Sequence, residues 1–205
     1  MTGTLVDGGD QVAQVITLLL LPVTLTDQRI SHWHATPDDA RDQIIRRLIA
    51  ISALVAIRVQ VAGIYFHAAV GKMAVPEWRD GTAIYYWFTD PMFGLSGITR
   101  EALWPVITNP VGVTLLTWGT ILFEITLFAA LFSARRVRPV LLVLGIMFHA
   151  AIAVIHGLLS FSLAMCGALI LFLRPPNELF NIRVPTIVRK ARSMARLNMW
   201  PKPAG

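Results

Sequence analysis

Apolar residues gather in four long runs along the chain, and polar or charged segments separate these runs. They cover residues 11–26, 48–70, 111–134 and 140–174. Runs of close to 20 apolar residues are typical of helices that cross a bilayer. The last run, at about 35 residues, is long enough for two short crossings, with a break near Gly-Leu-Leu-Ser at 157–160. The pattern predicts an all-α polytopic membrane protein, a bundle of about five transmembrane helices within a range of four to six.

Composition supports this class and changes how the charge is interpreted. The 205 residues are 55% hydrophobic and only 15% charged, whereas soluble domains are about 25% charged. The net charge of +6 is explained by the cytoplasmic bias of Lys and Arg in membrane proteins. We therefore expect membrane lipid, and no nucleic acid, as a partner.

The distribution of basic residues predicts an orientation. Segments 27–47, 135–138 and the chain from 174 onward hold 14 Lys and Arg residues, whereas 71–109 holds three. Positively charged loops stay on the cytoplasmic side. Five crossings then place the N-terminus outside and the C-terminus inside the cell (cytoplasmic) membrane.

Two segments frame the predicted bundle, which we assign to residues 1–176. Residues 73–109 form an aromatic extracytoplasmic loop, predicted as an interfacial or re-entrant segment because aromatic side chains favour the membrane interface. Residues 177–205 form a basic amphipathic cytoplasmic tail, with apolar and basic residues on opposite helical faces. A disordered basic tail is the alternative for this last segment.

Ionisable residues inside apolar spans are costly and therefore point to function. Arg58, Tyr65 and Lys72 share one face of the 48–70 helix, and His67 lies on nearly the opposite face with Gln60. A helix that is polar on both sides is expected to be surrounded by protein. Arg58 is expected to pair with an acid such as Glu124 or with a backbone carbonyl, and Lys72 either to reach the membrane surface or to take part in proton chemistry.

Further polar residues lie on the later spans. Glu124 follows three threonines at helical spacing, and His149 and His156 share a face of the next helix. Together with His67 and Lys72 they predict a polar internal cavity, although a buried histidine can also serve as a helix–helix hydrogen bond. The histidine spacing differs from the i, i+4 pair of helical zinc sites, so no metal site is predicted.

Two stretches resemble a known family. Tyr65-Phe66-x-Ala68-x-Val70-x-Lys72, followed by Trp78-x-x-Gly81, resembles a stretch of the vitamin K-dependent γ-carboxylase and its bacterial relatives, the HTTM membrane domains. Phe148-His149 and the Leu-Ser-Phe-Ser string at 159–162 resemble the next shared stretch. Residues 72–87 are similar to the sporulation-delaying protein B branch of that family.

The resemblance implies two kinds of chemistry. In the carboxylase, the lysine that matches Lys72 is the base that deprotonates reduced vitamin K, which implies a reduced quinone or vitamin K as cofactor. The sporulation-delaying branch implies a membrane component of a peptide-toxin maturation system. There it works with a small partner protein resembling sporulation-delaying protein A on a secreted peptide precursor.

Three functions therefore stay open. The first is the bacteriocin-like peptide-toxin maturation component, the second a quinol-dependent oxidoreductase or carboxylase of the γ-carboxylase type, and the third a non-catalytic immunity or scaffold protein. If the protein is an enzyme, Lys72 is the candidate base. The other candidate catalytic residues are His67, Glu124, His149 and His156, and the candidate substrate-binding residues are Arg58, Tyr65, Trp78, Tyr85, Tyr86 and Trp87.

Overall fold

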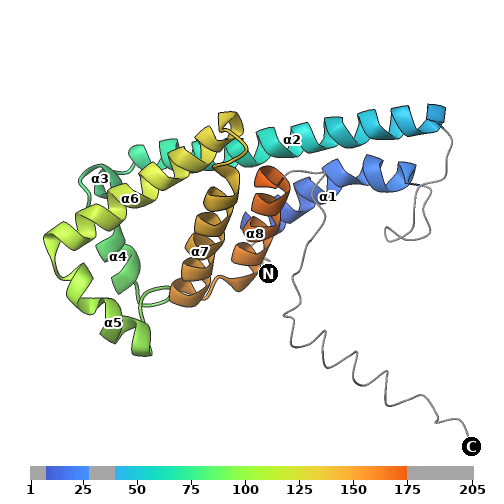
Figure 1. Ribbon diagram of the computed structural model, residues 1–205. Coiled ribbons are helices and arrows are strands. Elements are labelled where there is room, and N and C mark those ends of the chain that lie inside the picture. The colour runs from blue at the N-terminus through green and yellow to red at the C-terminus, as the bar shows by residue number, and fades with distance from the viewer. Residues whose placement is uncertain (1–7, 28–39, 175–205) are drawn as a thin grey trace, which may run out of the picture. The chain divides into compact units, whose positions relative to one another are not determined.

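The described part of the chain, residues 8–27 and 40–174 of a computed structural model, consists of helices and turns (Figure 1). The helices follow one another in the order α1 (Gly8–Thr26), α2 (Ala40–Met73), α3 (Pro76–Arg79), α4 (Ala83–Thr89), α5 (Gly97–Ile107), α6 (Pro110–Ala129), a 3₁₀ turn η1 (Ala130–Phe132), α7 (Arg138–His156) and α8 (Leu159–Leu173).

Four helical segments within the described residues are long and apolar enough to cross a membrane: Gly8–Thr26, Ile44–Met73, Pro110–Phe132 and Arg138–His156. Helix α8 is also apolar but has 15 residues, fewer than the approximately 20 of a full crossing. Large apolar side chains such as Leu18, Leu122 and Val143 are exposed on these helices, as suits a lipid environment. The chain is thus an all-α, multi-pass membrane protein, as predicted, with a fifth helix shorter than a full span.

Gly157 ends α7 and produces the predicted break in the last apolar run. Its φ of 71° is left-handed, a conformation that glycine adopts without steric penalty. The Gly157 N–H donates a hydrogen bond to the Ala153 carbonyl at 3.0 Å, and α8 begins two residues later. The α7–α8 hairpin therefore forms where the sequence predicted it.

Residues 73–109 are more ordered than a loop. Three short helices, α3, α4 and α5, occupy this segment, and both α4 and α5 pack against α6. The aromatic residues divide between two environments, because Trp78 and Phe88 are buried whereas Tyr85, Tyr86 and Trp87 are exposed. Part of the aromatic content of this segment therefore stabilises a folded layer, and its extracytoplasmic position stays a prediction.

Two apolar cores hold the described helices together. One lies around α8, where its side chains meet α1, α2 and the end of α6. The other lies where α3 and α4 pack against α2 and α6. The first core includes Ile57, Val61, Leu127, Leu169 and Phe172, and the second includes Trp78, Ile84, Phe88, Ile107 and Ile121.

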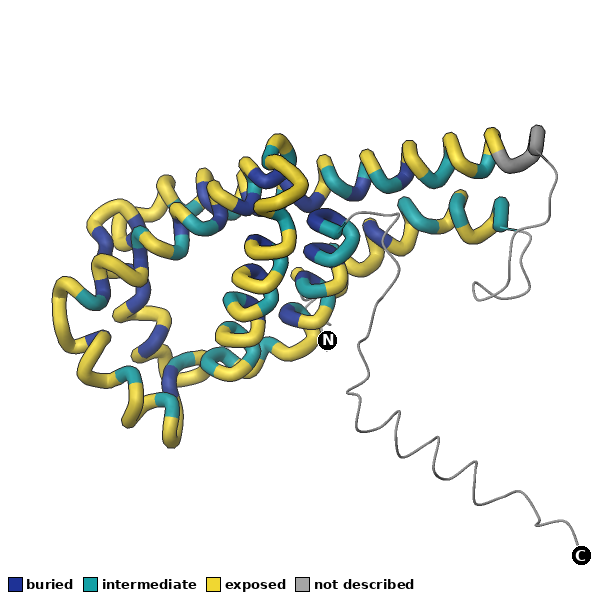
Figure 2. The backbone as a smooth tube through the Cα atoms, in the orientation of Figure 1, coloured by how far each residue is buried: buried dark blue, intermediate teal, exposed yellow. Residues whose placement is uncertain are grey.

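The prediction that protein surrounds α2 on both sides is wrong. Buried residues lie along one side of this helix, including Ala62, Tyr65 and Ala69, and the opposite side is exposed (Figure 2). The exposed positions include Gln60, Gly63, His67 and Gly71. Helix α2 packs against α1, α6 and α8, and these neighbours cover only its Tyr65 face.

The orientation of the chain stays a prediction, and the tail at 177–205 lies outside the described residues. We expect an outer 73–109 segment and an inner C-terminus because of the distribution of basic residues. In a Cys166→Ser background, an impermeant maleimide added to intact cells should label Glu101→Cys and spare Met199→Cys. The reverse labelling pattern would contradict the orientation, and labelling of both positions after lysis is the control.

Candidate functional site

A cavity of about 770 Å³ lies between the two apolar cores. Most of its wall is apolar and comes from α6 and α7, which approach each other through Phe123 and Phe148, with ring centroids 5.2 Å apart. The remaining wall comes from α2, α3, α4, the turn after α4 and the first part of α8. Its polar lining residues are Tyr65, Lys72, Trp78, Trp87, Thr120, Glu124, His149 and His156.

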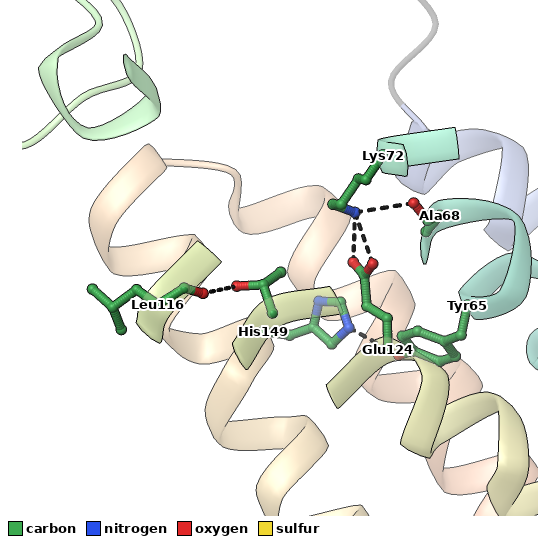
Figure 3. A network of polar contacts seen from close by, with 7 residues as sticks. Tyr65, Ala68, Lys72, Leu116, Glu124 and His149 are labelled. Atoms are coloured by element: carbon green, nitrogen blue, oxygen red, sulfur yellow. Dashed lines mark hydrogen bonds and ion pairs between the residues drawn. The ribbon is translucent and has the colours of Figure 1, made fainter. Parts of the chain in front are cut away.

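Lys72 and Glu124 form an ion pair on the cavity wall (Figure 3). The Lys72 Nζ donates to both carboxylate oxygens of Glu124, at 2.7 and 2.9 Å, and also lies 3.4 Å from the Ala68 carbonyl. The Trp78 ring centroid is 5.2 Å from the same Nζ, within the range of a cation–π contact. With side chains only 22% and 8% exposed for Lys72 and Glu124, both charges depend on each other for compensation.

This arrangement defines what the pair can do chemically. A protonated lysine is a donor only, whereas an ionised carboxylate is an acceptor only. The Lys72 amine can accept a proton only after its own proton has moved to Glu124. The pair as a unit can therefore accept one proton, either on Glu124 directly or on Lys72 after that transfer.

Tyr65 and His149 form a second polar pair on the same wall. The Tyr65 hydroxyl lies 2.9 Å from His149 Nε2, and both residues are 2% exposed. The His149 Nδ1 has no hydrogen-bond partner among the described residues. Tyr65 precedes Lys72 by seven residues, two turns of α2, so one face of this helix supplies both pairs to the cavity (Figure 3).

His156 joins the end of α7 to the turn that follows α4. Its Nδ1 donates to the Phe93 carbonyl at 2.7 Å, because a carbonyl oxygen can only accept. The turn itself is held by Asp90, whose Oδ1 accepts hydrogen bonds from the backbone N–H groups of Phe93 and Met92, each at 2.8 Å. These two bonds lower the pKa of Asp90, and they fix the carbonyl that His156 contacts.

The α3–α4 connection docks on α6 through Gly81 and Ile84. Gly81 has a φ of 78°, and a Cβ at this position would lie 3.1 Å from Thr114 Cγ2 and 3.3 Å from Trp118 Nε1. The Ile84 N–H donates to the buried Thr117 Oγ1 at 3.2 Å. Because Trp78 lies in α3, three residues before Gly81, this docking helps to hold its ring beside Lys72. This docking role was not predicted from the sequence, although the threonine spacing on α6 was a signal for it.

We expect Gly81→Ala to destabilise the protein and to weaken the site. A left-handed conformation costs about 1–2 kcal/mol for a residue with a Cβ, and the contact with Thr114 adds to this cost. Thermal unfolding of the detergent-purified protein should show a lower Tm than the wild type. Gly63→Ala is the matched control, because its helical Cβ would meet nothing within 4 Å; equal Tm values for the two variants would contradict the docking role.

The structure brings seven of the eleven candidate residues to one cavity: Tyr65, Lys72, Trp78, Trp87, Glu124, His149 and His156. It does not bring His67, which is exposed on the opposite face of α2, or Tyr85 and Tyr86, which are exposed on α4 and do not line the cavity.

Arg58 also lies away from this cavity. Its Nη2 donates to the Arg174 carbonyl at 3.1 Å, which confirms the carbonyl alternative and not the Glu124 pairing. Glu124 pairs instead with Lys72, fourteen residues farther along α2. Helical spacing alone left both partners on the same face and could not choose between them.

Comparisons with known proteins agree with this architecture. The sequence model of the HTTM domain family matches residues 17–176. The chain is 42% identical to the uncharacterized protein YitO of Bacillus subtilis (strain 168) over 83% of this chain and 54% of YitO. It is 38% identical to the sporulation-delaying protein SdpB of the same organism, over 84% of this chain and 53% of SdpB.

The chain thus spans about half the length of the curated relatives that it matches. No solved structure matches it significantly. The match to the HTTM domain covers α2 to α8, including every helix that lines the cavity. This protein therefore belongs to the HTTM domain family.

Proposed function

We propose that the protein is the component of a peptide-toxin maturation system that acts in the cytoplasmic membrane, and that its cavity receives a secreted peptide precursor. The similarity to SdpB supports the system, and the resemblance to the sporulation-delaying branch adds a small partner protein resembling sporulation-delaying protein A. The observation that carries the proposal is the Lys72–Glu124 pair on the wall of a large apolar cavity.

The cavity suits an apolar peptide segment that carries a few polar groups. Binding pockets commonly combine apolar walls with a small number of placed polar residues. Here the apolar wall of α6 and α7 would hold side chains of the precursor, and the polar pairs on the α2 face would contact its backbone or a reacting group.

The Lys72–Glu124 pair would act by accepting a proton from the group that reacts. If Glu124 takes the proton, it becomes a neutral acid, and the Lys72 ammonium stabilises the anion left on the substrate. If Lys72 takes the proton, as the resemblance to the carboxylase implies, its own proton must first move to Glu124. In both routes the pair ends with one proton more, and the cavity wall protects the charges from water.

A second candidate function is a quinol-dependent oxidoreductase or carboxylase. The residues present fit a quinol, because Phe123 and Phe148 supply aromatic walls while Tyr65, His149 and Glu124 supply hydrogen-bonding groups for ring hydroxyls. A bound quinol would supply reducing equivalents. Quinol-dependent oxygen uptake by the purified protein, lost in Lys72→Met, would favour this function over peptide maturation.

Deletion and complementation in the producing strain test the first proposal. The peptides secreted by the wild type, the deletion strain and the complemented strain are compared by mass spectrometry. We expect the mature peptide to disappear on deletion, its precursor to accumulate, and the wild-type gene to restore processing. Unchanged processing in the deletion strain would refute the role in maturation, and processed peptide with loss of producer survival would favour an immunity protein.

A further inference from the structure

A second, smaller pocket lies where α2 passes the start of α7 and the end of α8. It has a volume of about 180 Å³ and lies apart from the larger cavity, with which it shares no lining residue. Two arginines, Arg58 from α2 and Arg138 from the first position of α7, contribute the polar part of its wall. The apolar part comes from Val55, Val59, Leu131 and Phe172.

The two guanidinium groups are only partly satisfied by the protein. Arg58 Nη2 donates to the Arg174 carbonyl at 3.1 Å, and Arg138 Nη2 donates to the Ser133 carbonyl at 3.3 Å. The Nε groups of both arginines are buried and have no hydrogen-bond partner among the described residues. A buried donor without a partner is costly, and more so when it is charged, which indicates that a ligand completes the site.

The electrostatics of the pocket favour an anion. The charges of Arg138 and Arg135 both act on Arg58, and no carboxylate in the described ranges pairs with Arg58 or Arg138. The first turn of α7 adds the positive end of a 19-residue helix, whose N-cap residue Val137 makes no side-chain capping bond. Two guanidinium groups and a helix N-terminus thus meet at this pocket without a compensating negative charge from the described residues.

We propose that this pocket binds a phosphate group, and that the phosphate belongs to the headgroup of an anionic phospholipid. Guanidinium forks match phosphate oxygens with two parallel hydrogen bonds. The apolar residues of the pocket distinguish a lipid from a soluble phosphate, because they can contact the glycerol and the first methylenes of an acyl chain. Basic pockets between transmembrane helices are a known way to hold lipid headgroups.

The proposal is tested with the full-length protein purified in detergent. Its Tm is measured with added phosphatidylglycerol, with a diacylglycerol of the same acyl chains, and with inorganic phosphate, and retained lipid is measured by native mass spectrometry. We expect phosphatidylglycerol alone to raise the Tm and to remain bound. Arg58→Gln and Arg138→Gln should each weaken its binding about tenfold or more, because each removes charge-assisted hydrogen bonds.

The matched controls are Arg100→Gln and Arg136→Gln, two arginines that do not line the pocket; they should bind phosphatidylglycerol as the wild type does. Arg58→Lys keeps the positive charge but loses the guanidinium fork. If this variant has the wild-type Tm without lipid but binds phosphatidylglycerol more weakly, the site is supported even where a glutamine variant fails to fold. An equal, arginine-dependent shift with inorganic phosphate would keep the phosphate site and overturn the lipid source. Binding that is unchanged in both glutamine variants would overturn the proposal.

Discussion

Replacing Lys72 with methionine should abolish peptide maturation while the protein still accumulates in the membrane. Methionine has a similar length and is apolar, so it fits the partly buried position but can neither hold nor exchange a proton. General acid–base groups contribute about 10²–10⁴-fold to rate, so we expect a loss of at least about 10²-fold. The measurement is the ratio of mature peptide to precursor at matched protein levels.

An arginine at this position separates proton chemistry from simple pairing. Lys72→Arg can still form a bidentate ion pair with Glu124, but a guanidinium stays protonated and cannot accept a proton. If Lys72 is the group that takes the substrate proton, this variant should fold normally and be inactive. Full activity would assign proton acceptance to Glu124 alone, and full activity of both the methionine and arginine variants would remove Lys72 from the site. Arg100→Met is the control, because Arg100 forms a similar cation–π contact with Trp104 outside the cavity.

Loss of the Glu124 carboxylate should destabilise the fold. Glu124→Leu leaves the Lys72 ammonium without its acid on the cavity wall, and breaking a buried pair from one side costs about 3–5 kcal/mol. Glu124→Gln should cost less, since its amide oxygen still accepts a hydrogen bond from Lys72. Thermal unfolding of the purified variants should therefore give the order wild type, Gln, Leu in decreasing Tm.

The double variant Lys72→Met with Glu124→Leu tests whether the cost comes from the unpaired charge. Replacing both partners of a buried ion pair with apolar residues is often neutral or stabilising. We expect the double variant to regain most of the Tm lost by Glu124→Leu while remaining inactive. If the double variant instead loses as much stability as the two single variants combined, the pair is not energetically coupled. That result would contradict the ion pair seen in the structure.

The helical part of this architecture was predictable because lipid restricts what a chain can do. Runs of apolar residues must form helices in a bilayer, so the spans at 48–70 and 140–174 could be located from hydropathy. Gly157, with left-handed backbone, marks the break that divides the second of these runs. The sequence also predicted Lys72, Tyr65 and Glu124 as candidate site residues, since polar groups at membrane depth are rare.

The pairing of these residues was not predictable from one sequence. Periodicity places Arg58 and Lys72 on the same face of α2, but the choice of Lys72 as the partner of Glu124 depends on where α6 crosses that helix. His67 was misplaced because a polar residue in a span was assumed to face protein, whereas only one side of α2 is covered. The helices within 73–109 were missed because they are short and dock through backbone contacts at Gly81 and Ile84.

The most direct test of the central claim fills the cavity without changing the ion pair. Gly119 lines the cavity, and a Cβ added there meets nothing within 4 Å; Gly63, on the exposed face of α2, has the same free space. If the cavity receives the precursor, Gly119→Phe should abolish peptide maturation at normal protein levels, and Gly63→Phe should leave it intact. Normal maturation by Gly119→Phe would contradict the assignment of this cavity as the functional site.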